Sequence, residues 1–420
     1  MIKIGIIGVG TVGESVANIL EQNSDIIEAR AGKKIVVKHG VVHNLNKKRG
    51  VNISLSDDAN DILEDSEIDI VVELMGGVEK PYEIVKKALS NGKSVVTANK
   101  ALLAYHRYEL QELAGDIPFM YEASTAGGIP IIGALRNGLS ANHIDSIMGI
   151  MNGTCNYMLT KMINEGALYD DILKESQELG YAEADPTFDV GGFDAAHKLL
   201  ILASIAYGID AKPEDILIEG IENITDTDVA FAKEFGYEIK LLGIAKKIGD
   251  GVELRVHSTL IPQDSMIAKV DGVMNAITVV GDRVGETMYY GAGAGGDATA
   301  SAVISDIIDI ARGNQGPMLG YKRSLESGLK LLNKDDITSK YYIRLEVNDE
   351  SGVLASIASL LGEFNISIES MLQKPSINKS KANVLFTTHT CKERDIQNAI
   401  NDLASLSEVD ENIAMIRIEK

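Results

Sequence analysis

Cysteines, basic side chains and long apolar runs are all scarce in this 420-residue sequence. Its two cysteines, Cys155 and Cys391, stand far apart and outside any CxxC pattern, which excludes a disulfide framework or a zinc ribbon and favours a reducing, cytoplasmic setting. Forty lysines and arginines against 61 aspartates and glutamates give a formal charge of −21, so no nucleic-acid partner is expected. No apolar run approaches the ~20 residues of a membrane span, and neither a membrane partner nor a signal peptide is expected.

The first 130 residues instead alternate short apolar runs with amphipathic segments. Strands are expected at residues 2–7, 35–43, 68–74, 94–97 and 118–123. Helices are expected between them, for example at residues 11–20 and 82–89. This alternation predicts an α/β fold built on a Rossmann-type, doubly wound parallel sheet.

A GxGxxG motif, Gly8, Gly10 and Gly13, lies between the first expected strand and the first expected helix. In a dinucleotide-binding fingerprint, the first glycine permits the tight turn, the second lets the backbone approach a pyrophosphate, and the third allows close helix packing. The helix start at Thr11 and Val12 then offers free N–H groups to phosphates. A turn with a purely structural role is the alternative.

The type of cofactor should depend on the end of the second strand. His43 to Asn46 supply no carboxylate for the ribose hydroxyl of NAD, and Lys47, Lys48 and Arg49 follow. These charges suit a 2′-phosphate and therefore favour NADP, with NAD still possible. A solvated basic turn is the alternative interpretation.

The pattern changes after about residue 130. A strand at 144–150 and helices at 156–165, 169–179 and 194–207 precede strands at 239–248, 252–261, 273–280 and 286–290. Two of these strands are joined through Gly249-Asp250-Gly251, a hairpin signal, so we expect an antiparallel sheet with helices in an α+β domain.

The C-terminal third begins with a glycine-rich stretch and a helix near 297–312, and residues 313–340 are polar and rich in turn residues. From residue 341 the order βαββαβ predicts a ferredoxin-like module. We therefore expect a Rossmann domain at 1–130 to which the helix near 297–312 returns, a second domain at 131–312, a linker at 313–340 and a module at 341–420.

Four carboxylates, Glu183, Asp185, Asp189 and Asp194, fall within twelve residues, and Lys198 follows the last of them by one helical turn. A lysine at the head of an apolar helix loses hydration, which lowers its pKa and suits a proton donor. An ordinary i,i+4 ion pair is the alternative.

Two further residues have an open interpretation. Lys100 follows a strand end, where it could reach a nicotinamide or a substrate, but a plain surface lysine is equally compatible. A nucleophilic Cys155 would need a nearby base and an electropositive pocket, so a buried, inert thiol is the preferred interpretation.

Taken together, these segments resemble homoserine dehydrogenases with a C-terminal ACT domain, over essentially the whole chain. The matching segments are IGVGTVG (7–13), TANKALLA (97–104), EASTAGGIPII (122–132), GIMNGTCNYML (149–159), GYAEADPTFDVGGFDAAHKLLILA (180–203) and GAGAGGDATASAV (291–303). The segment at 180–203 is specific to that family, whereas the glycine motif alone is not. The resemblance implies NAD(P)-dependent interconversion of L-homoserine and L-aspartate 4-semialdehyde, on the route to threonine and methionine.

The resemblance also implies roles for individual residues. Lys198 matches the proton donor, Lys100 the second lysine of the site, and Asp194 a catalytic carboxylate. The expected substrate contacts are Glu183, Asp189 and Asp194. The expected cofactor contacts are Gly8, Gly10, Thr11, Val12, Gly13, Thr97, Lys100, Gly180, Gly293 and Gly295. A sodium ion is expected at Glu122, Thr125, Gly127 and Ile129.

The C-terminal module resembles an ACT domain, which pairs between subunits and binds a small amino acid. Asp349, Gly352, Asn365 and Ile366 are the expected regulatory residues, with L-threonine as the suspected effector and a homodimer or homotetramer as the expected assembly. A chain that ends near Asp336 is expected to fold and keep catalysis.

Two other functions compete with this interpretation. One is a semialdehyde dehydrogenase that works through a covalent Cys155 thioester, and the other is a non-catalytic, cofactor-bound amino-acid sensor. A sensor has no need for Lys100, Lys198 and the carboxylates around them, so the enzyme is preferred.

Overall fold

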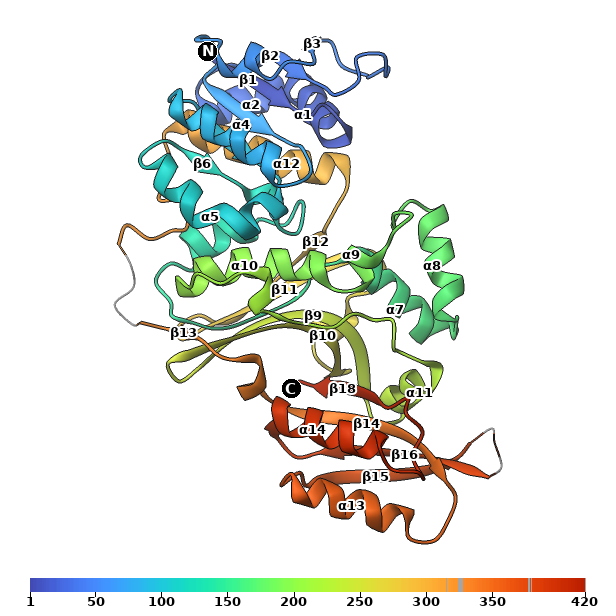
Figure 1. Ribbon diagram of the computed structural model, residues 1–420. Helices are drawn as coiled ribbons and strands as arrows, with labels where there is room; N and C mark the ends of the chain where they lie inside the picture. Colours follow the sequence, from blue (N-terminus) through green and yellow to red (C-terminus); the bar gives the residue numbers. More distant parts are fainter. Residues whose placement is uncertain (315, 324–327, 377, 379, 420) are drawn as a thin grey trace.

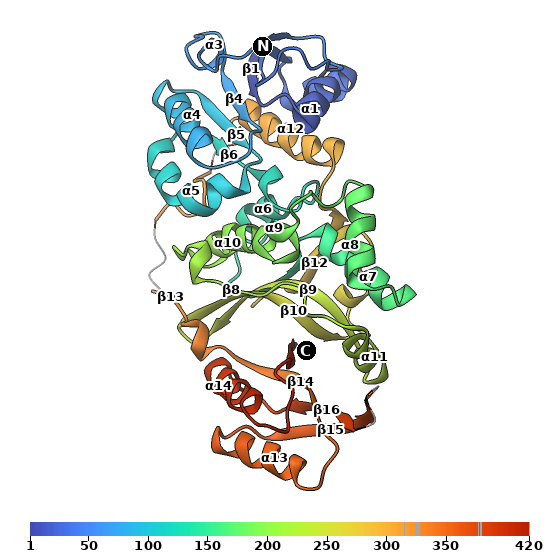
Figure 2. The same cartoon turned by 45° about the vertical axis from the view of Figure 1, so that its right-hand side comes forward.

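The computed structural model describes residues 1–314, 316–323, 328–376, 378 and 380–419. Figures 1 and 2 show a parallel sheet with helices at one end of the molecule, a large sheet with helices in the middle, and a small module at the opposite end. No helix in these ranges is long and apolar enough to cross a bilayer.

The N-terminal sheet is parallel throughout, with the strand order β3-β2-β1-β4-β5-β6. Its strands are β1 (Ile2–Ile7), β2 (Ile35–Val41), β3 (Ser54–Ser56), β4 (Ile70–Glu73), β5 (Ser94–Thr97) and β6 (Phe119–Met120). The central strand β4 is buried along its whole length, because helices cover both faces of a parallel sheet.

Helices lie on both faces of this sheet. They are α1 (Thr11–Gln22), α2 (Ser24–Ala31), α3 (Asn60–Leu63), α4 (Glu79–Ser90), α5 (Lys100–Ala114) and α12 (Gly296–Arg312). Side chains of α1, α2 and α12 share one apolar cluster, and those of α4 and α5 belong to another. Figure 1 shows α12, from late in the sequence, beside α1.

The second sheet is mixed and continues into the C-terminal module, in the order β12-β11-β7-β9-β10-β18-β14-β16-β15. Its middle part contains β7 (Ile144–Ile150), β8 (Leu217–Ile218), β9 (Tyr237–Ile248), β10 (Gly251–Pro262), β11 (Met274–Gly281), β12 (Gly285–Ala292) and β13 (Lys330–Leu331). The module contributes β14 (Thr338–Asn348), β15 (Ile368–Pro375), β16 (Lys381–Thr388), β17 (Cys391–Lys392) and β18 (Ala414–Ile418).

The helices around the second sheet connect it to the N-terminal domain. They are α6 (Ile131–Gly133), α7 (Gly153–Glu165), α8 (Tyr169–Glu178), α9 (Thr187–Val190), α10 (Phe193–Tyr207) and α11 (Asp226–Glu234), with α13 (Val353–Glu363) and α14 (Glu393–Ala404) in the module. Short turns of 3₁₀ or π helix lie at η1 (Glu122–Ser124), η2 (Ala134–Gly138), η3 (Pro213–Asp215), η4 (Ile267–Lys269) and η5 (Lys334–Asp336). The apolar α10 packs on β9 and β10 on one side and on α5 on the other, so it lies between the two domains.

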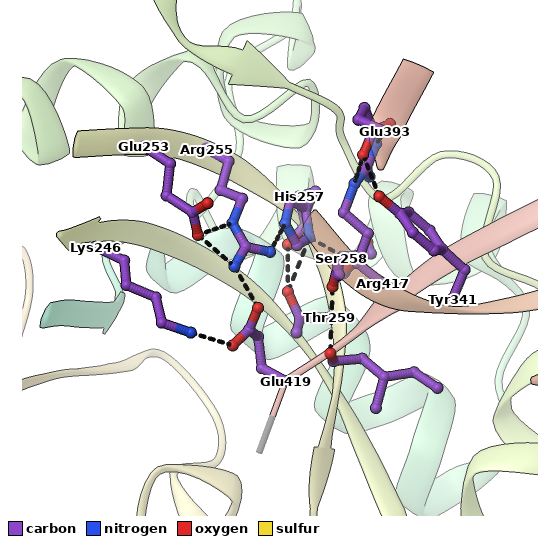
Figure 3. Close-up of polar contacts among 12 residues, drawn as sticks. Lys246, Glu253, Arg255, His257, Ser258, Thr259, Tyr341, Glu393, Arg417 and Glu419 are labelled. Carbon is purple, nitrogen blue, oxygen red and sulfur yellow. Dashed lines mark hydrogen bonds and ion pairs between the residues drawn. The ribbon is translucent and has the colours of Figure 1, made fainter. Parts of the chain in front are cut away.

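Buried ion pairs join the module to the middle of the second sheet (Figure 3). Arg255 on β10 binds Glu419, which follows β18. Arg417 on β18 binds Glu219 beside β8 at 2.6 and 2.8 Å, and it also binds Glu393 at the start of α14. Both arginines are fully buried, and a buried charge is tolerated only when it is paired.

The predicted fold class is confirmed: a Rossmann-type parallel sheet, a second sheet domain and a βαββαβ module follow one another along the chain. The strand expected at residues 118–123 is wrong in extent. Only Phe119–Met120 pair with β5, because the chain then turns into η1.

The segment expected as a linker, residues 313–340, carries ordered structure where it is described. Met318 and Leu319 are buried in the main core, and β13 pairs with β10. Residues 315 and 324–327 of this segment lie outside the described residues.

Candidate active site

The GxGxxG loop has the geometry that the fingerprint requires. Gly8 has φ +103°, and a Cβ there would lie 2.7 Å from the carbonyl oxygen of Leu74. A Cβ on Gly13 would lie 2.6 Å from the Gly8 carbonyl oxygen, whereas a Cβ on Gly10 would meet no atom within 4 Å. The first and third glycines are therefore required by packing, and the second leaves open space in front of the loop.

A second glycine-rich segment, residues 291–296, brings another helix start to the same place. Gly295, with φ +117°, precedes α12, and a Cβ on Gly296 would lie 2.7 Å from Ser15 Oγ and 3.2 Å from Thr11 Cγ2. The N-termini of α1 and α12 thus converge, and their free N–H groups favour a bound anion such as a pyrophosphate.

A cavity of about 690 Å³ opens beside this loop at the ends of β1 and β2, with Gly8, Val41 and His43 among its lining residues. Asp57 and Asp58, which follow β3, also line it. The cavity lies where the adenosine half of a dinucleotide belongs in this fold.

Arg49 of the basic turn lies across the glycine loop. Its guanidinium donates to the carbonyls of Val9 at 2.7 Å, Asn44 at 2.9 Å and Lys47 at 2.9 Å. Lys47 and Lys48 are exposed beside it, so the turn contacts the loop through Arg49 and presents the two lysine charges to solvent.

Between the two domains, one buried carboxylate joins two lysines. Asp194, in the first turn of α10, lies 2.8 Å from Lys100 through Oδ1 and 2.8 Å from Lys198 through Oδ2. Lys198 Nζ also donates to the Met151 carbonyl at 2.6 Å, which leaves one of its three protons free. Lys100 opens α5 in the N-terminal domain, so the cluster spans the domain boundary.

Burial and ion pairing shift the pKa values of the two lysines in opposite directions. Burial lowers the pKa of Lys198, and the partial compensation by Asp194 does not restore it. Burial also acts against the charge of Lys100, but Asp194 outweighs it and the pKa of Lys100 is raised. Burial likewise opposes ionisation of Asp194, yet the two ammonium groups hold its pKa below the usual range.

Lys100 is placed by a chain of hydrogen bonds at the ends of β4 and β5. Asn99 caps α5 by accepting from the Leu102 amide at 3.0 Å. Thr97 Oγ1 accepts from the Asn99 amide at 3.0 Å and donates to the buried Glu73 at 2.6 Å. The hydroxyl of Thr97, an expected cofactor contact, is therefore engaged within the protein.

The other expected substrate residues surround this cluster. Asp189, at the end of α9, has its pKa raised by burial, with Asp194 adding a like charge. Glu183 is exposed on the preceding loop and close enough to Lys100 to help raise the pKa of that lysine. Gly180, an expected cofactor contact, starts the same loop with φ +76°. At Gly293, another expected cofactor contact, a Cβ would clash with Asn275 at 2.1 Å.

The chain matches the family described as "Homoserine dehydrogenase" over residues 130–308, "Homoserine dehydrogenase, NAD binding domain" over 8–117 and "ACT domain" over 341–408. The homoserine dehydrogenase of Helicobacter pylori is 56% identical over 418 residues, which cover 100% of this chain and 99% of that protein. The chain belongs to the homoserine dehydrogenase family. It is an NAD(P)-dependent oxidoreductase of amino-acid biosynthesis, and its C-terminal module is an ACT domain.

Solved homoserine dehydrogenases share the fold. That of Thiobacillus denitrificans is 44% identical with a TM-score of 0.94, covering 100% of this chain and 98% of the other. A hyperthermophilic archaeal homoserine dehydrogenase in complex with NADPH is 28% identical with a TM-score of 0.61, covering 73% and 97%. The matched ranges follow the order of the expected domains, whose exact bounds stay a prediction.

Cys155 does not have the surroundings of a nucleophile. It is fully buried in α7, and its thiol donates to the Asp189 carbonyl at 3.2 Å. Burial, together with the nearby carboxylates, raises the pKa of this thiol well above its usual value. A thioester route through Cys155 would need the opposite shift of the pKa, so these surroundings favour the interpretation of Cys155 as a buried, inert thiol.

The expected sodium residues lie in one segment against the 291–296 glycines. Gly128 donates to the Ala292 carbonyl at 3.2 Å, and burial raises the pKa of the Glu122 carboxyl to about 7. The described residues contain no group of three or more His, Cys, Asp or Glu that could hold a metal. Glu122 is buried and its carboxylate accepts from the amides of Ile132 and Gly133, while the Oγ1 of Thr125 has no hydrogen-bond partner among the described atoms. The sodium site therefore stays a prediction.

The expected regulatory residues lie at the two ends of α13. Asp349 and Gly352 precede this helix, and Asn365 and Ile366 follow it. Eleven residues at ~1.5 Å each separate the two pairs by roughly 16 Å along the helix axis. One chain therefore does not bring all four together.

Asn152 is the residue at this site that the sequence did not single out. It precedes α7, and its side chain contacts both Asp189 and Asp194. An asparagine before Gly-Thr at a helix start signals a cap. The contacts with Asp189 and Asp194 join Asn152 to residues 37 and 42 positions later, so no local pattern could indicate them.

Proposed function

We propose that the enzyme interconverts L-homoserine and L-aspartate 4-semialdehyde at the cluster of Lys100, Lys198 and Asp194. The observation that carries the proposal is the buried Asp194 carboxylate, which holds both lysines at 2.8 Å where the two domains meet. When bound, the nicotinamide cofactor supplies or accepts the hydride.

Lys198 is the proton donor in the reduction of the semialdehyde. Two of its protons are held by Asp194 and by the Met151 carbonyl, so the third can point to the oxygen on which an alkoxide develops. Its lowered pKa favours release of that proton. Lys100, with its raised pKa, stays charged and positions Asp194 and the cofactor side of the site.

Glu183 and Asp189 bind the charged end of the substrate. A substrate with an ammonium group needs a carboxylate that is not neutralised by the lysines, and the exposed Glu183 meets that need. Asp194 completes the substrate contacts through its position between the lysines.

NADP is the proposed cofactor. Lys47, Lys48 and Arg49 lie beside the glycine loop, and NADPH is the ligand of the archaeal relative. NAD is the second candidate, because Asp57 and Asp58 line the adenosine cavity and could bind ribose hydroxyls. The proposed contacts are those of the sequence prediction, with the backbone of Thr11, Val12 and the glycines at the phosphates.

Sodium is proposed at Glu122 with the carbonyls of Thr125, Gly127 and Ile129. The cation would offset the buried charge of Glu122 and tie this segment to the glycines near residue 293. Replacing sodium by tetramethylammonium in an activity and melting assay tests the proposal. An unchanged Tm and unchanged turnover would remove the ion.

L-Threonine is the proposed effector, bound where ACT domains of two subunits pair, and a homodimer or homotetramer is the proposed assembly. The separation of Asp349 and Gly352 from Asn365 and Ile366 supports a site shared between two chains. We also propose a cytoplasmic location, because the two cysteines are free thiols and thiols stay reduced in the cytoplasm.

Steady-state oxidation of NADPH with L-aspartate 4-semialdehyde tests the proposed site. Lys198→Ala should lower kcat by about two to four orders of magnitude, the usual effect of losing a general acid, while cofactor binding persists. Lys161→Ala, which changes a half-buried lysine of α7 paired with Glu165, is the matched control and should keep parental turnover. Near-parental turnover of Lys198→Ala would reduce that residue to an ion-pair partner.

A further inference from the structure

Asn152 is buried where three segments of the active site meet. It follows β7, and its Oδ1 accepts from the Cys155 amide at 2.8 Å, which caps α7. Its side-chain Nδ2 donates to Asp189 Oδ1 at 2.8 Å and to Asp194 Oδ2 at 2.9 Å. Both amide protons are therefore spent on the two carboxylates.

These two hydrogen bonds act on the same atoms as the lysines. Asp194 Oδ2 accepts from Asn152 and from Lys198, so the amide and the ammonium share one carboxylate oxygen. The amide lies on a different segment from Asp194 and fixes the rotation of its carboxylate. That rotation determines where Lys198 Nζ lies.

The amide also brings two like charges together without adding a charge of its own. A third ammonium at this position would add positive charge beside Lys100 and Lys198, and a third carboxylate would repel Asp189 and Asp194. The ionisable groups that act on Asp189 and Asp194 come from every side of the pair: Lys100 on α5, Cys155 on α7, and His197 and Lys198 on α10. Among the side chains of the described residues that donate to Asp189 and Asp194, Asn152 is the one whose donors do not titrate.

We propose that Asn152 is a positioning residue of the dehydrogenase: its amide sets the orientation of Asp194, and thereby of Lys198, and holds Asp189 beside them. The proposal rests on the roles given above to Lys198 and Asp194. It adds a group that does not touch the reacting atoms but determines their geometry.

Two variants separate this role from the helix cap. Asn152→Ser and Asn152→Asp both keep a side-chain oxygen that caps a helix about as well as asparagine does. The serine removes the amide, and the aspartate keeps the shape but replaces two donors by acceptors. Neither change reaches the glycine loop, so NADP binding should stay as in the parent.

We expect kcat to fall about 10- to 100-fold in Asn152→Ser, the loss typical of a hydrogen bond to a charged group. The fall should be larger in Asn152→Asp at neutral pH, because a third carboxylate joins the pair. The acidic limb of the kcat/KM profile should move to higher pH in both variants, since the carboxylates lose a donor that stabilises their charged form. The thermal midpoint should fall less in Asn152→Ser than in Asn152→Asp, where the new carboxylate is buried against two others.

The outcomes distinguish this inference from the proposed function. Parental kcat and an unmoved pH profile in Asn152→Ser, with Lys198→Ala inactive, would leave Asn152 as a helix cap only and overturn the inference. If Asn152→Ser does not fold, the isosteric Asn152→Asp tests the inference through the acidic limb of its kcat/KM profile. If Lys198→Ala is itself fully active, the proposed site falls and this inference falls with it.

Discussion

At the scale of single residues, burial separates two chemically identical groups to which the proposed mechanism gives different roles. Lys100 and Lys198 both lie 2.8 Å from Asp194, yet the side chain of Lys100 is 37% exposed and that of Lys198 only 10%. The lost hydration lowers the pKa of the deeper lysine, while the shallower one gains from its partner. A single carboxylate thus serves one lysine that can give up a proton and one that keeps its charge.

Glu183 should determine substrate affinity more than turnover. We expect Glu183→Gln to raise the KM for homoserine about 10-fold or more with a small change in kcat, because a neutral amide cannot pair with the substrate ammonium. Steady-state kinetics with varied homoserine measures both constants.

The control for Glu183 lies in the same loop. The Asp185 carboxylate accepts from the amide and hydroxyl of Thr187, at 3.1 and 2.7 Å, and does not take part in the lysine cluster. Asp185→Asn should therefore leave the KM unchanged. Equal effects of the two variants, or a collapse of NADP affinity in Glu183→Gln, would mean that the loop has been assigned wrongly.

The sequence indicates the active-site groups when their spacing is local and misses them when it is not. Asp194 and Lys198 are one helical turn apart, and the apolar run behind them predicts the buried helix on which they lie. Asn152 reaches the same carboxylate from 42 residues earlier, and the pairing of Lys100 with Asp194 spans 94 positions. The first contact depends on how the start of α7 packs against α10, and the second on how the two domains pack. No local pattern encodes either.

At the scale of elements, the inner strands of the N-terminal sheet were predictable because burial on both faces demands unbroken apolar runs. The edge strand β3, whose residues are exposed or half-buried, was not expected. β1 and β5 lie where the sequence placed them. Residues 118–123 also read as apolar, but the Glu122 carboxylate accepts from the amides of Ile132 and Gly133 at 2.8 and 2.7 Å. Those bonds draw the chain into η1, so hydrogen bonding to a later segment overrides the strand pattern.

The basic turn after β2 gives a prediction at this scale. Replacing Lys47 and Lys48 by glutamine should lower the preference for NADP over NAD about 10-fold, because the 2′-phosphate loses charge-assisted contacts. The ratio of kcat/KM for the two cofactors measures this preference.

Arg49 serves as the comparison within the same turn. Its guanidinium holds the Val9, Asn44 and Lys47 carbonyls, so Arg49→Gln should weaken both cofactors by disturbing the loop. An unchanged ratio in the double lysine variant would mean that the turn points away from the adenosine ribose.

At the scale of the whole molecule, the ACT domain is continuous with the catalytic sheet. β18 pairs with β14 inside the module and, in parallel, with β10 outside it, at Thr259 and Arg417. A strand order within 341–420 is predictable from local pattern, but the choice of an outside partner strand is not. A chain ending near Asp336 would leave the buried Asp228 without its partner Arg344. We therefore expect such a chain to be less stable than the full-length protein.

Threonine binding gives the regulatory prediction. If the paired modules bind L-threonine, titration calorimetry on the full chain should show binding, and threonine should inhibit only if it favours one arrangement of the modules over the other. Asp349→Ala, far from the lysine cluster, should abolish both effects and keep basal turnover. Absence of heat at millimolar threonine, together with an uninhibited enzyme, would remove threonine as the effector.

The buried charges at the module boundary give the stability prediction. Arg255 lies between Glu253, at 2.9 Å, and Glu419, and both carboxylates are buried with it (Figure 3). Arg255→Met removes the ion-pair partner of the buried Glu253 and leaves Glu419 with Lys246 at 3.8 Å, so it should lower the free energy of unfolding by about 3–5 kcal/mol.

The matched control approaches the same carboxylate from the surface. Lys246 lies 3.8 Å from Glu419 with its side chain 42% exposed, so Lys246→Met should cost less than about 1 kcal/mol. The chain has no tryptophan and 14 tyrosines, so urea unfolding can be followed by tyrosine fluorescence. Replacing Glu253 and Glu419 by glutamine in the Arg255→Met background should restore much of the loss, because the unpaired charges disappear with it. If Arg255→Met and Lys246→Met unfold at the same urea concentration, the boundary is held by strand pairing and apolar contact, and the ion pairs there are energetically neutral.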